Sequence, residues 1–181
     1  MSPCVVRIHK EIYSLLRHPP KDFICRPKFD DFSLEIILNG APGTCYENGT
    51  FVLELVVPKQ YPFESPKLQF MTSIYHPNVD ISGRICLDLL GGGWCPSNTL
   101  HHLLEAVKCL MYHPNIEDPL IPERAFQYKY DYDEFQRKAK EWTRIFAPKL
   151  DMNVLKPPMD YNRKRQFEQE EVTYGSRKRY F

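Results

Sequence analysis

The sequence YPFESPKLQFMTSIYHPNVDISGRICLDLL, residues 61–90, passes from a strand-like pattern into a long segment rich in turn-forming residues. The alternating run KLQFM ends at residue 71. Beyond it lie a His76-Pro77-Asn78 corner, a glycine turn and one cysteine, Cys86, between two apolar residues. A cysteine in such a setting is most often a small buried hydrophobe. The rest of the chain must therefore indicate whether Cys86 is a core residue or a reactive thiol.

Upstream of this segment, the sequence predicts one helix and then an antiparallel meander. Residues 2–18 place apolar side chains on one face of a helix, which Pro19-Pro20 ends. Strand-like patterns then predict strands at residues 32–38, 51–57 and 67–71, and a further short strand between residues 21 and 27 would complete a four-stranded meander.

Downstream, the sequence predicts a long loop and then helices. Residues 72–98 show little periodicity but are too apolar for disorder, which favours a packed, functional loop. Helical patterns follow from the cap at Asn98 or Thr99 to His113, and over residues 122–130 and 133–146. In the last helix one apolar face is predicted to hold Phe135, Ala139, Trp142 and Phe146. The fold class is thus α/β, of the α+β kind.

The chain of 181 residues is predicted to form one domain, residues 1–150, followed by a flexible charged tail, residues 151–181. The tail lacks the apolar periodicity needed for packing. Its two basic clusters, 163–165 and 177–179, fit either a nuclear-import signal or a solvated tail. We expect a monomer located in the nucleus and cytoplasm.

Composition excludes several classes of function. A net charge of +1 gives no global field for nucleic acid or a membrane surface, and neither partner is expected. The six cysteines form no C-x-x-C pair and, without a signal peptide, are expected to be reduced thiols. The cysteines and histidines lack zinc-site spacing, and no phosphate-binding glycine loop is present. We therefore expect neither a metal nor a cofactor.

Five motifs follow one another along the chain: the Tyr-Pro-Phe loop (61–63), the His-Pro-Asn corner (76–78), ICLD (85–88), WCP (94–96) and PNIEDPL (114–120). With these motifs in order, the chain resembles a ubiquitin-conjugating enzyme from the RIHKEI helix to about Ala147. Within the family, YPFE, IYHPNVD and GRICLDLL are most similar to the T-type enzymes, which serve a Fanconi-anaemia ligase. The resemblance implies the ubiquitin-conjugating fold and a role in DNA repair.

The resemblance implies that Cys86 accepts ubiquitin from an activating enzyme as a thioester and passes it to a lysine. Such a transfer needs a nucleophilic thiol and a donor for the tetrahedral oxyanion. Asn78 either supplies that donor or braces the loop through backbone hydrogen bonds. His76 reads as part of a rigid turn, with a general base as the alternative. The resemblance places Asp88 and Asp118 near the thiol, where they would orient and desolvate the lysine, although Asp118 also suits a plain turn.

The resemblance also implies two partner surfaces. Phe63 and Pro96 lie where the family docks RING-type ligases. Arg7 and Lys10 lie on the first helix, a surface that the family uses both for ligases and for the activating enzyme. Flanking prolines favour an exposed loop tip for Phe63, with core packing as the alternative. The resemblance further implies a cis peptide bond before Pro62.

Two other functions fit the same fold. One is a binding or adaptor module without transfer activity, and the other is a transferase for a different ubiquitin-like protein. Intact Cys86, Asn78 and Asp118 argue against the adaptor. The sequence alone does not distinguish whether the group transferred is ubiquitin or another ubiquitin-like protein.

Overall fold

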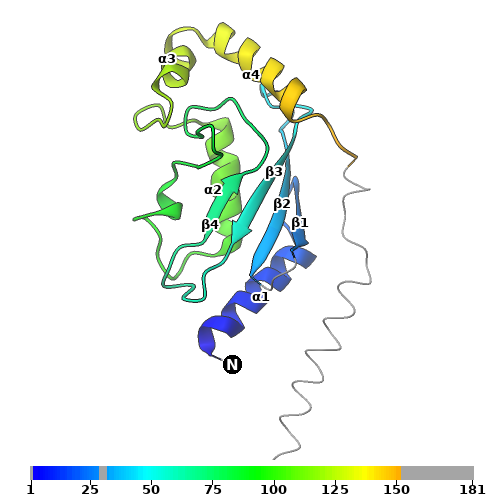
Figure 1. Cartoon of the computed structure of the whole chain (residues 1–181), viewed down its shortest axis with the longest axis vertical. Coiled ribbons are helices and arrows are strands. Elements are labelled where there is room, and N and C mark those ends of the chain that lie inside the picture. The colour runs from blue at the N-terminus through cyan, green and yellow to red at the C-terminus, as the bar shows by residue number, and fades with distance from the viewer. Residues whose placement is uncertain (1, 29–31, 152–181) are drawn as a thin grey trace, which may run out of the picture. The chain divides into compact units, whose positions relative to one another are not determined.

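The fold is that of a computed structural model, which describes residues 2–28 and 32–151. In this part of the chain, a helix and a four-stranded sheet are followed by a long loop and three more helices (Figure 1). The predicted tail lies outside the described residues except for Asp151. The elements are α1 (Pro3–Arg17), β1 (Phe23–Pro27), β2 (Ser33–Asn39), β3 (Thr50–Val56), β4 (Lys67–Phe70), the short 3-10 helix η1 (Asp88–Leu90), α2 (Leu100–Tyr112), α3 (Pro122–Tyr130) and α4 (Tyr132–Phe146).

The sheet is the predicted antiparallel meander, with strand order β1-β2-β3-β4. Its register brings Leu34, Leu55 and Leu68 side by side on three neighbouring strands, and all three are buried. Alternate residues share a face in a strand, so this row places the apolar side of the sheet on the core.

The helices α1 and α2 share one core with the sheet. Helix α1 begins at the cap residue Ser2 and buries Ile8, Ile12 and Leu15. Helix α2 begins after Thr99, whose side chain accepts a hydrogen bond from the His102 N–H. Within the described ranges, no helix has the length and apolar character needed to cross a membrane.

The inward face of α4 differs from the predicted one. Phe135 and Ala139 are buried as expected, but Thr143 continues the buried stripe while Phe146 is 46% exposed. The reason is that Thr143 packs closely against Gly49. Even a Cβ atom added to Gly49 would lie 2.5 Å from a methyl carbon of Thr143, so the space between them admits only a small side chain at position 143. Phe146 instead lies at the surface, with its ring 4.8 Å from that of Trp142.

The long loop after β4 is packed rather than disordered, as predicted. Residues 74–79 are all buried, and Val79 pairs with Ile85 in an isolated bridge. The turn between them needs glycine, because Gly83 has a φ of +87° and a Cβ there would lie 1.8 Å from the Phe70 carbonyl oxygen. The loop thereby delivers Cys86 to a fixed position next to the His-Pro-Asn corner.

Candidate active site

The corner is held by the imidazole of His76, which is fully buried. Its Nε2 lies 2.9 Å from the Leu110 carbonyl oxygen, and its Nδ1 accepts a hydrogen bond from the Asn78 N–H at 3.0 Å. An acceptor at Nδ1 and a carbonyl at Nε2 require the neutral tautomer protonated at Nε2. Burial lowers the pKa of His76 to about 4, so the ring is neutral near pH 7. These contacts fit the structural role expected for His76.

The Asn78 side chain fastens the corner to the loop before α3. Its Nδ2 donates to the carbonyl oxygens of Asn115 and Asp118, at 2.7 and 3.1 Å. Its Oδ1 accepts from the Asn115 N–H at 2.9 Å. Both amide hydrogens are therefore used in bracing, and donating to an oxyanion would require releasing one of these bonds. The oxyanion role stays a prediction.

Cys86 lies between these two segments and is partly exposed. Its backbone N–H donates to the Asn78 carbonyl at 2.9 Å. Its Sγ lies 3.4 Å from Oδ2 of Asp118, a residue 32 positions away in the sequence. The structure thus brings three of the four predicted catalytic residues, Cys86, Asn78 and Asp118, into direct contact.

The fourth, Asp88, is exposed and begins η1. Its backbone carbonyl accepts from the N–H groups of Gly91 and Gly93, which fixes the loop after the cysteine. The Asp88 carboxylate acts on Cys86 through its charge, which helps to raise the pKa of the thiol. Within residues 2–28 and 32–151, no group of three or more His, Cys, Asp or Glu side chains is arranged to hold a metal ion.

Comparison with known proteins places the chain in a family. A model described as "Ubiquitin-conjugating enzyme" matches residues 7–143. The chain belongs to the ubiquitin-conjugating enzyme family.

Several relatives are named "Ubiquitin-conjugating enzyme E2 T". The chain is 42% identical to the one from Xenopus laevis over 150 residues, which cover 79% of this chain and 77% of the relative. It is 41% identical to the Mus musculus protein over 146 residues, 78% of this chain and 72% of the relative. For the Homo sapiens protein the identity is 39% over 148 residues, 78% and 74% of the two chains. As a ubiquitin-conjugating enzyme, the protein transfers ubiquitin and interacts with ubiquitin, an activating enzyme and ligases.

In this ubiquitin-conjugating enzyme, the thiol of Cys86 is in its protonated form at rest. Partial burial raises its pKa, and the hydrogen bond to Asp118 and the charges of Asp118 and Asp88 raise it further, against a smaller opposing effect of Arg84. The neighbouring thiol, Cys95, is exposed. Hydrogen bonding by Ser97 lowers the pKa of Cys95. The two thiols of the loop therefore differ in thiolate content.

This difference predicts the order of alkylation. We expect iodoacetamide to modify Cys95 faster than Cys86 near neutral pH, because the thiolate is the nucleophile. As pH rises, modification of Cys86 should keep accelerating after that of Cys95 has levelled off. Asp118→Asn should speed modification of Cys86 by removing a nearby negative charge, and Asp88→Asn should do so less. Peptide-resolved mass spectrometry across a range of pH measures these rates. An unchanged Cys86 rate in Asp118→Asn would show that this carboxylate does not control the thiol.

The two loops predicted to dock a ligase carry exposed tips. Phe63 is 76% exposed, so the core-packing alternative for it is wrong, and Pro96 is exposed as well. The peptide bond before Pro62 is cis, as expected. The indole N–H of Trp94 donates to the Pro62 carbonyl at 2.7 Å, which links the two loops directly.

The two basic residues of α1 differ in availability. Lys10 is exposed. Arg7 contacts its own chain: Nε pairs with Glu11 at 2.8 Å, Nη2 donates to the Asn98 carbonyl at 2.8 Å, and the guanidinium lies over the Tyr61 ring. Arg7 therefore serves first to join α1 to the docking loops, and a direct partner contact by Arg7 stays a prediction.

Sequence reasoning did not identify Glu11, which is central to this junction. Its Oε2 accepts from the Tyr61 hydroxyl and from the Leu100 N–H, both at 2.8 Å. A carboxylate that receives an N–H at the beginning of α2 also interacts favourably with the helix dipole. One signal was available, because Glu11 directly precedes Ile12 of the buried face and carries a charge close to the core.

Proposed function

We propose that Cys86 carries the ubiquitin thioester and that Asp118 and Asn78 assist its transfer to lysine. The proposal rests on one observation, the approach of the Cys86 sulfur to the Asp118 carboxylate at 3.4 Å. In the loading step, the Cys86 sulfur attacks the thioester carbonyl that the activating enzyme presents. The activating enzyme's sulfur leaves, and the proton lost by Cys86 is taken up by that leaving thiolate.

In the transfer step, a neutral lysine amine attacks the Cys86 thioester. Nitrogen–carbon bond formation and carbon–sulfur bond cleavage give the isopeptide and the Cys86 thiolate. The esterified sulfur holds no proton, so Asp118 is free to accept the proton that the amine loses and to return it to the leaving sulfur. Asn78 stabilises the intermediate either by holding the Asp118 loop or by donating an N–H to the oxyanion.

The proposal is tested by charging. The protein is incubated with ATP and ubiquitin, or with other ubiquitin-like proteins one at a time, each with its own activating enzyme. A reductant-sensitive adduct with ubiquitin alone is expected. An equal adduct with another tag, or an adduct that maps to a cysteine other than Cys86, would contradict the proposal.

We propose further that the ligase is of the RING type and docks on Phe63 and Pro96. An exposed aromatic ring at a loop tip next to an exposed proline is a typical anchor for a small interface. The bond between Trp94 and Pro62 supports this, because it holds the two tips as one surface. Of the two basic residues predicted to contact partners from α1, Arg7 and Lys10, the exposed Lys10 is the one proposed to reach the activating enzyme or the ligase.

Phe63→Ala should leave charging near the wild-type level and weaken the ligase-stimulated discharge by about 30-fold or more, because truncating an aromatic residue that is a hot spot of an interface costs at least ~2 kcal/mol. Discharge of preformed thioester is measured with and without a RING ligase. Phe126→Ala is the matched control, since Phe126 is also a largely exposed aromatic residue but lies on α3. Equal stimulation of Phe63→Ala and Phe126→Ala by the ligase would show that Phe63 is not part of the interface.

We propose further that the enzyme acts in DNA repair, as the resemblance of its motifs to the T-type enzymes implies, and that it is a monomer in the nucleus and cytoplasm that does not bind nucleic acid. The basic clusters at 163–165 and 177–179 are the proposed import signal. Replacing both clusters by alanine should shift a fluorescent fusion out of the nucleus. An unchanged distribution would leave the tail with no import role.

A further inference from the structure

A buried arginine in α3 lies behind the His-Pro-Asn corner. Arg124 is only 8% exposed, which is rare for an arginine. Its guanidinium lies over the Tyr75 ring at 4.4 Å from the centroid and 5.7 Å from that of Trp142. Its Nη1 donates to the carbonyl oxygens of Ile74, His76 and Val79, at 3.1, 3.5 and 3.5 Å. A charged side chain is thus used to bind backbone on both sides of the corner.

The need for such a donor follows from the backbone of residues 74–79. These residues are buried and lie outside any helix or strand, so their carbonyl groups lack the partners that regular structure provides. Each carbonyl nevertheless has a donor. Arg124 serves Ile74, His76 and Val79; the Tyr46 hydroxyl serves Tyr75; the Ile121 N–H serves Pro77; and the Cys86 N–H serves Asn78.

Among the contacts described, Arg124 is the donor for the carbonyls of Ile74 and Val79, and it shares the His76 carbonyl with the Val79 N–H. The Pro77 carbonyl depends on Ile121 at the beginning of the same helix. The first turn of α3 and its cap residue thus hydrogen-bond to the backbone both before and after Asn78. Asn78 in turn holds the Cys86 backbone through its carbonyl and the Asp118 loop through its side chain. A shift of the corner would move both the thiol and the carboxylate.

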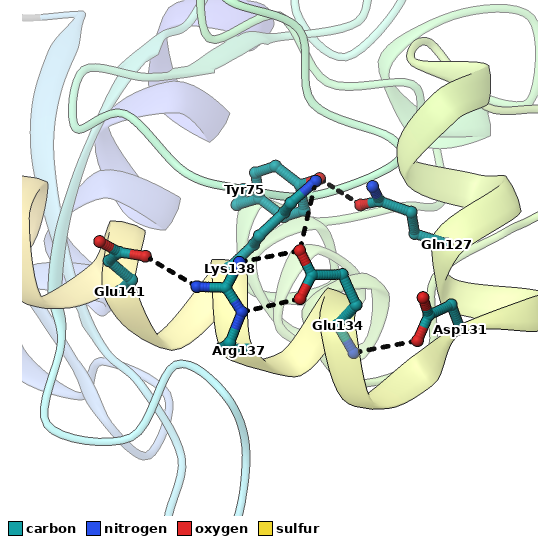
Figure 2. Close-up of polar contacts among 7 residues, drawn as sticks. All are labelled: Tyr75, Gln127, Asp131, Glu134, Arg137, Lys138 and Glu141. Atoms are coloured by element: carbon teal, nitrogen blue, oxygen red, sulfur yellow. Dashed lines mark hydrogen bonds and ion pairs between the residues drawn. The ribbon is translucent and has the colours of Figure 1, made fainter.

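Tyr75 connects the same contacts to α4. Figure 2 shows its hydroxyl pointing at Gln127 of α3, with which it makes a hydrogen bond, beside the ion pairs of Glu134 with Arg137 and Lys138 on α4. The Tyr75 ring also packs against Phe135 at 5.6 Å between centroids. The residue before the corner, Tyr75, therefore contacts both α3 and α4, and Arg124 adds the hydrogen bonds that hold the corner itself to α3.

We propose that Arg124 is a positioning residue for ubiquitin transfer, which sets the distance between the Cys86 sulfur and the Asp118 carboxylate by clamping residues 74–79 to α3. This rests on the proposed roles of Cys86 and Asp118. Arg124 touches neither, so its effect reaches the reaction only through the corner.

Arg124→Met tests the clamp, because methionine keeps much of the apolar volume and removes every donor. The maximal rate of discharge of preformed thioester to free lysine should fall by up to about 100-fold, the cost that a misplacement of about 1 Å can have. The lysine concentration at half-maximal rate should stay unchanged. Arg124→Lys retains a charged donor for the carbonyls and should recover most of the loss.

Lys108→Met is the matched control for lost stability. Lys108 also ties a helix to a backbone carbonyl, that of Lys21, and pairs with Asp22, but it has no contact with the corner. Discharge by this variant should be normal when both proteins are assayed below their unfolding temperatures. Equal discharge by Arg124→Met and Lys108→Met would overturn the proposal.

Two readouts do not depend on activity. Burial is the main cause of the low pKa of His76, and the charge of Arg124 lowers that pKa further, so the ring titration of His76, followed by NMR, should move upward in Arg124→Met but not in Arg124→Lys. Amide exchange at Asn78 and Cys86 should accelerate in Arg124→Met. Unchanged titration and exchange would refute the clamp, even if Cys86 carried no ubiquitin. If both change while wild-type protein charges elsewhere than Cys86, the clamp holds and the proposed catalytic assignment fails.

Discussion

Cys86→Ala should form no reductant-sensitive ubiquitin adduct, whereas wild-type protein charges fully in the presence of activating enzyme and ATP. The loss should be complete, because the thioester bond needs the sulfur itself. Cys86→Ser should give an adduct that survives reductant, since a serine hydroxyl forms an oxygen ester. Non-reducing and reducing gels run side by side distinguish these outcomes.

The control for this experiment is Cys95→Ser, nine residues further along the loop. Cys95 is exposed and bonded to Ser97, and no oxyanion donor is positioned for it by the contacts described above. Its serine variant should charge at close to the wild-type rate. If Cys95→Ser loses the reducible adduct and Cys86→Ala keeps it, the assignment of the active thiol is wrong.

The second large effect is expected at Asn78. Asn78→Ala should still charge but should discharge to free lysine about 10²–10³-fold more slowly, the cost of ~2.7–4 kcal/mol known for losing an oxyanion donor. Asp118→Ala should also slow discharge more than charging. Single-turnover discharge of purified thioester measures both. Unchanged rates in both variants would leave the two residues with structural roles only.

The two roles considered for Asn78 give different results in the same variant. If Asn78 mainly braces the loop, Asn78→Ala should also accelerate amide exchange at Cys86, whose N–H bonds to the Asn78 backbone carbonyl that the substitution retains. If it mainly donates to the oxyanion, discharge should fall while exchange at Cys86 changes little. Asn115→Ala is the control, because the contacts of Asn78 with Asn115 use the Asn115 backbone.

Much of the fold could be predicted from the sequence, because periodicity and punctuation residues are local signals. The strands alternate, α1 begins after Ser2 and ends before two prolines, and Thr99 caps α2. The catalytic cluster came from motif resemblance instead, since Cys86 and Asp118 are 32 residues apart and nothing local brings them together. The same reason explains the errors. Whether α4 turns Thr143 or Phe146 inward depends on the space beside Gly49, which lies in another part of the chain.

Arg124 was beyond the reach of the sequence for a related reason. Periodicity identifies which face of a helix is apolar, and an arginine on such a helix is normally assigned to solvent. Its burial follows from the irregular backbone of residues 74–79, where the carbonyls of Ile74 and Val79 receive no donor from within the segment among the contacts described. The hydrogen-bond donor that this loop requires thus comes from a helix about fifty residues later in the sequence.

The junction around Glu11 has a consequence for the kinetics of ligase recruitment. Three hydrogen bonds connect α1 with Tyr61 of the first docking loop and with Asn98 and Leu100 just beyond the second. A fourth, from Trp94 to Pro62, connects the two docking loops with each other. The loop tips therefore lose little conformational entropy when a ligase binds, since their arrangement is already set in the free enzyme. Binding should then resemble the meeting of two rigid bodies, with little change of backbone shape. Differences in affinity among ligases would appear mainly in how long each complex lasts rather than in how fast it forms.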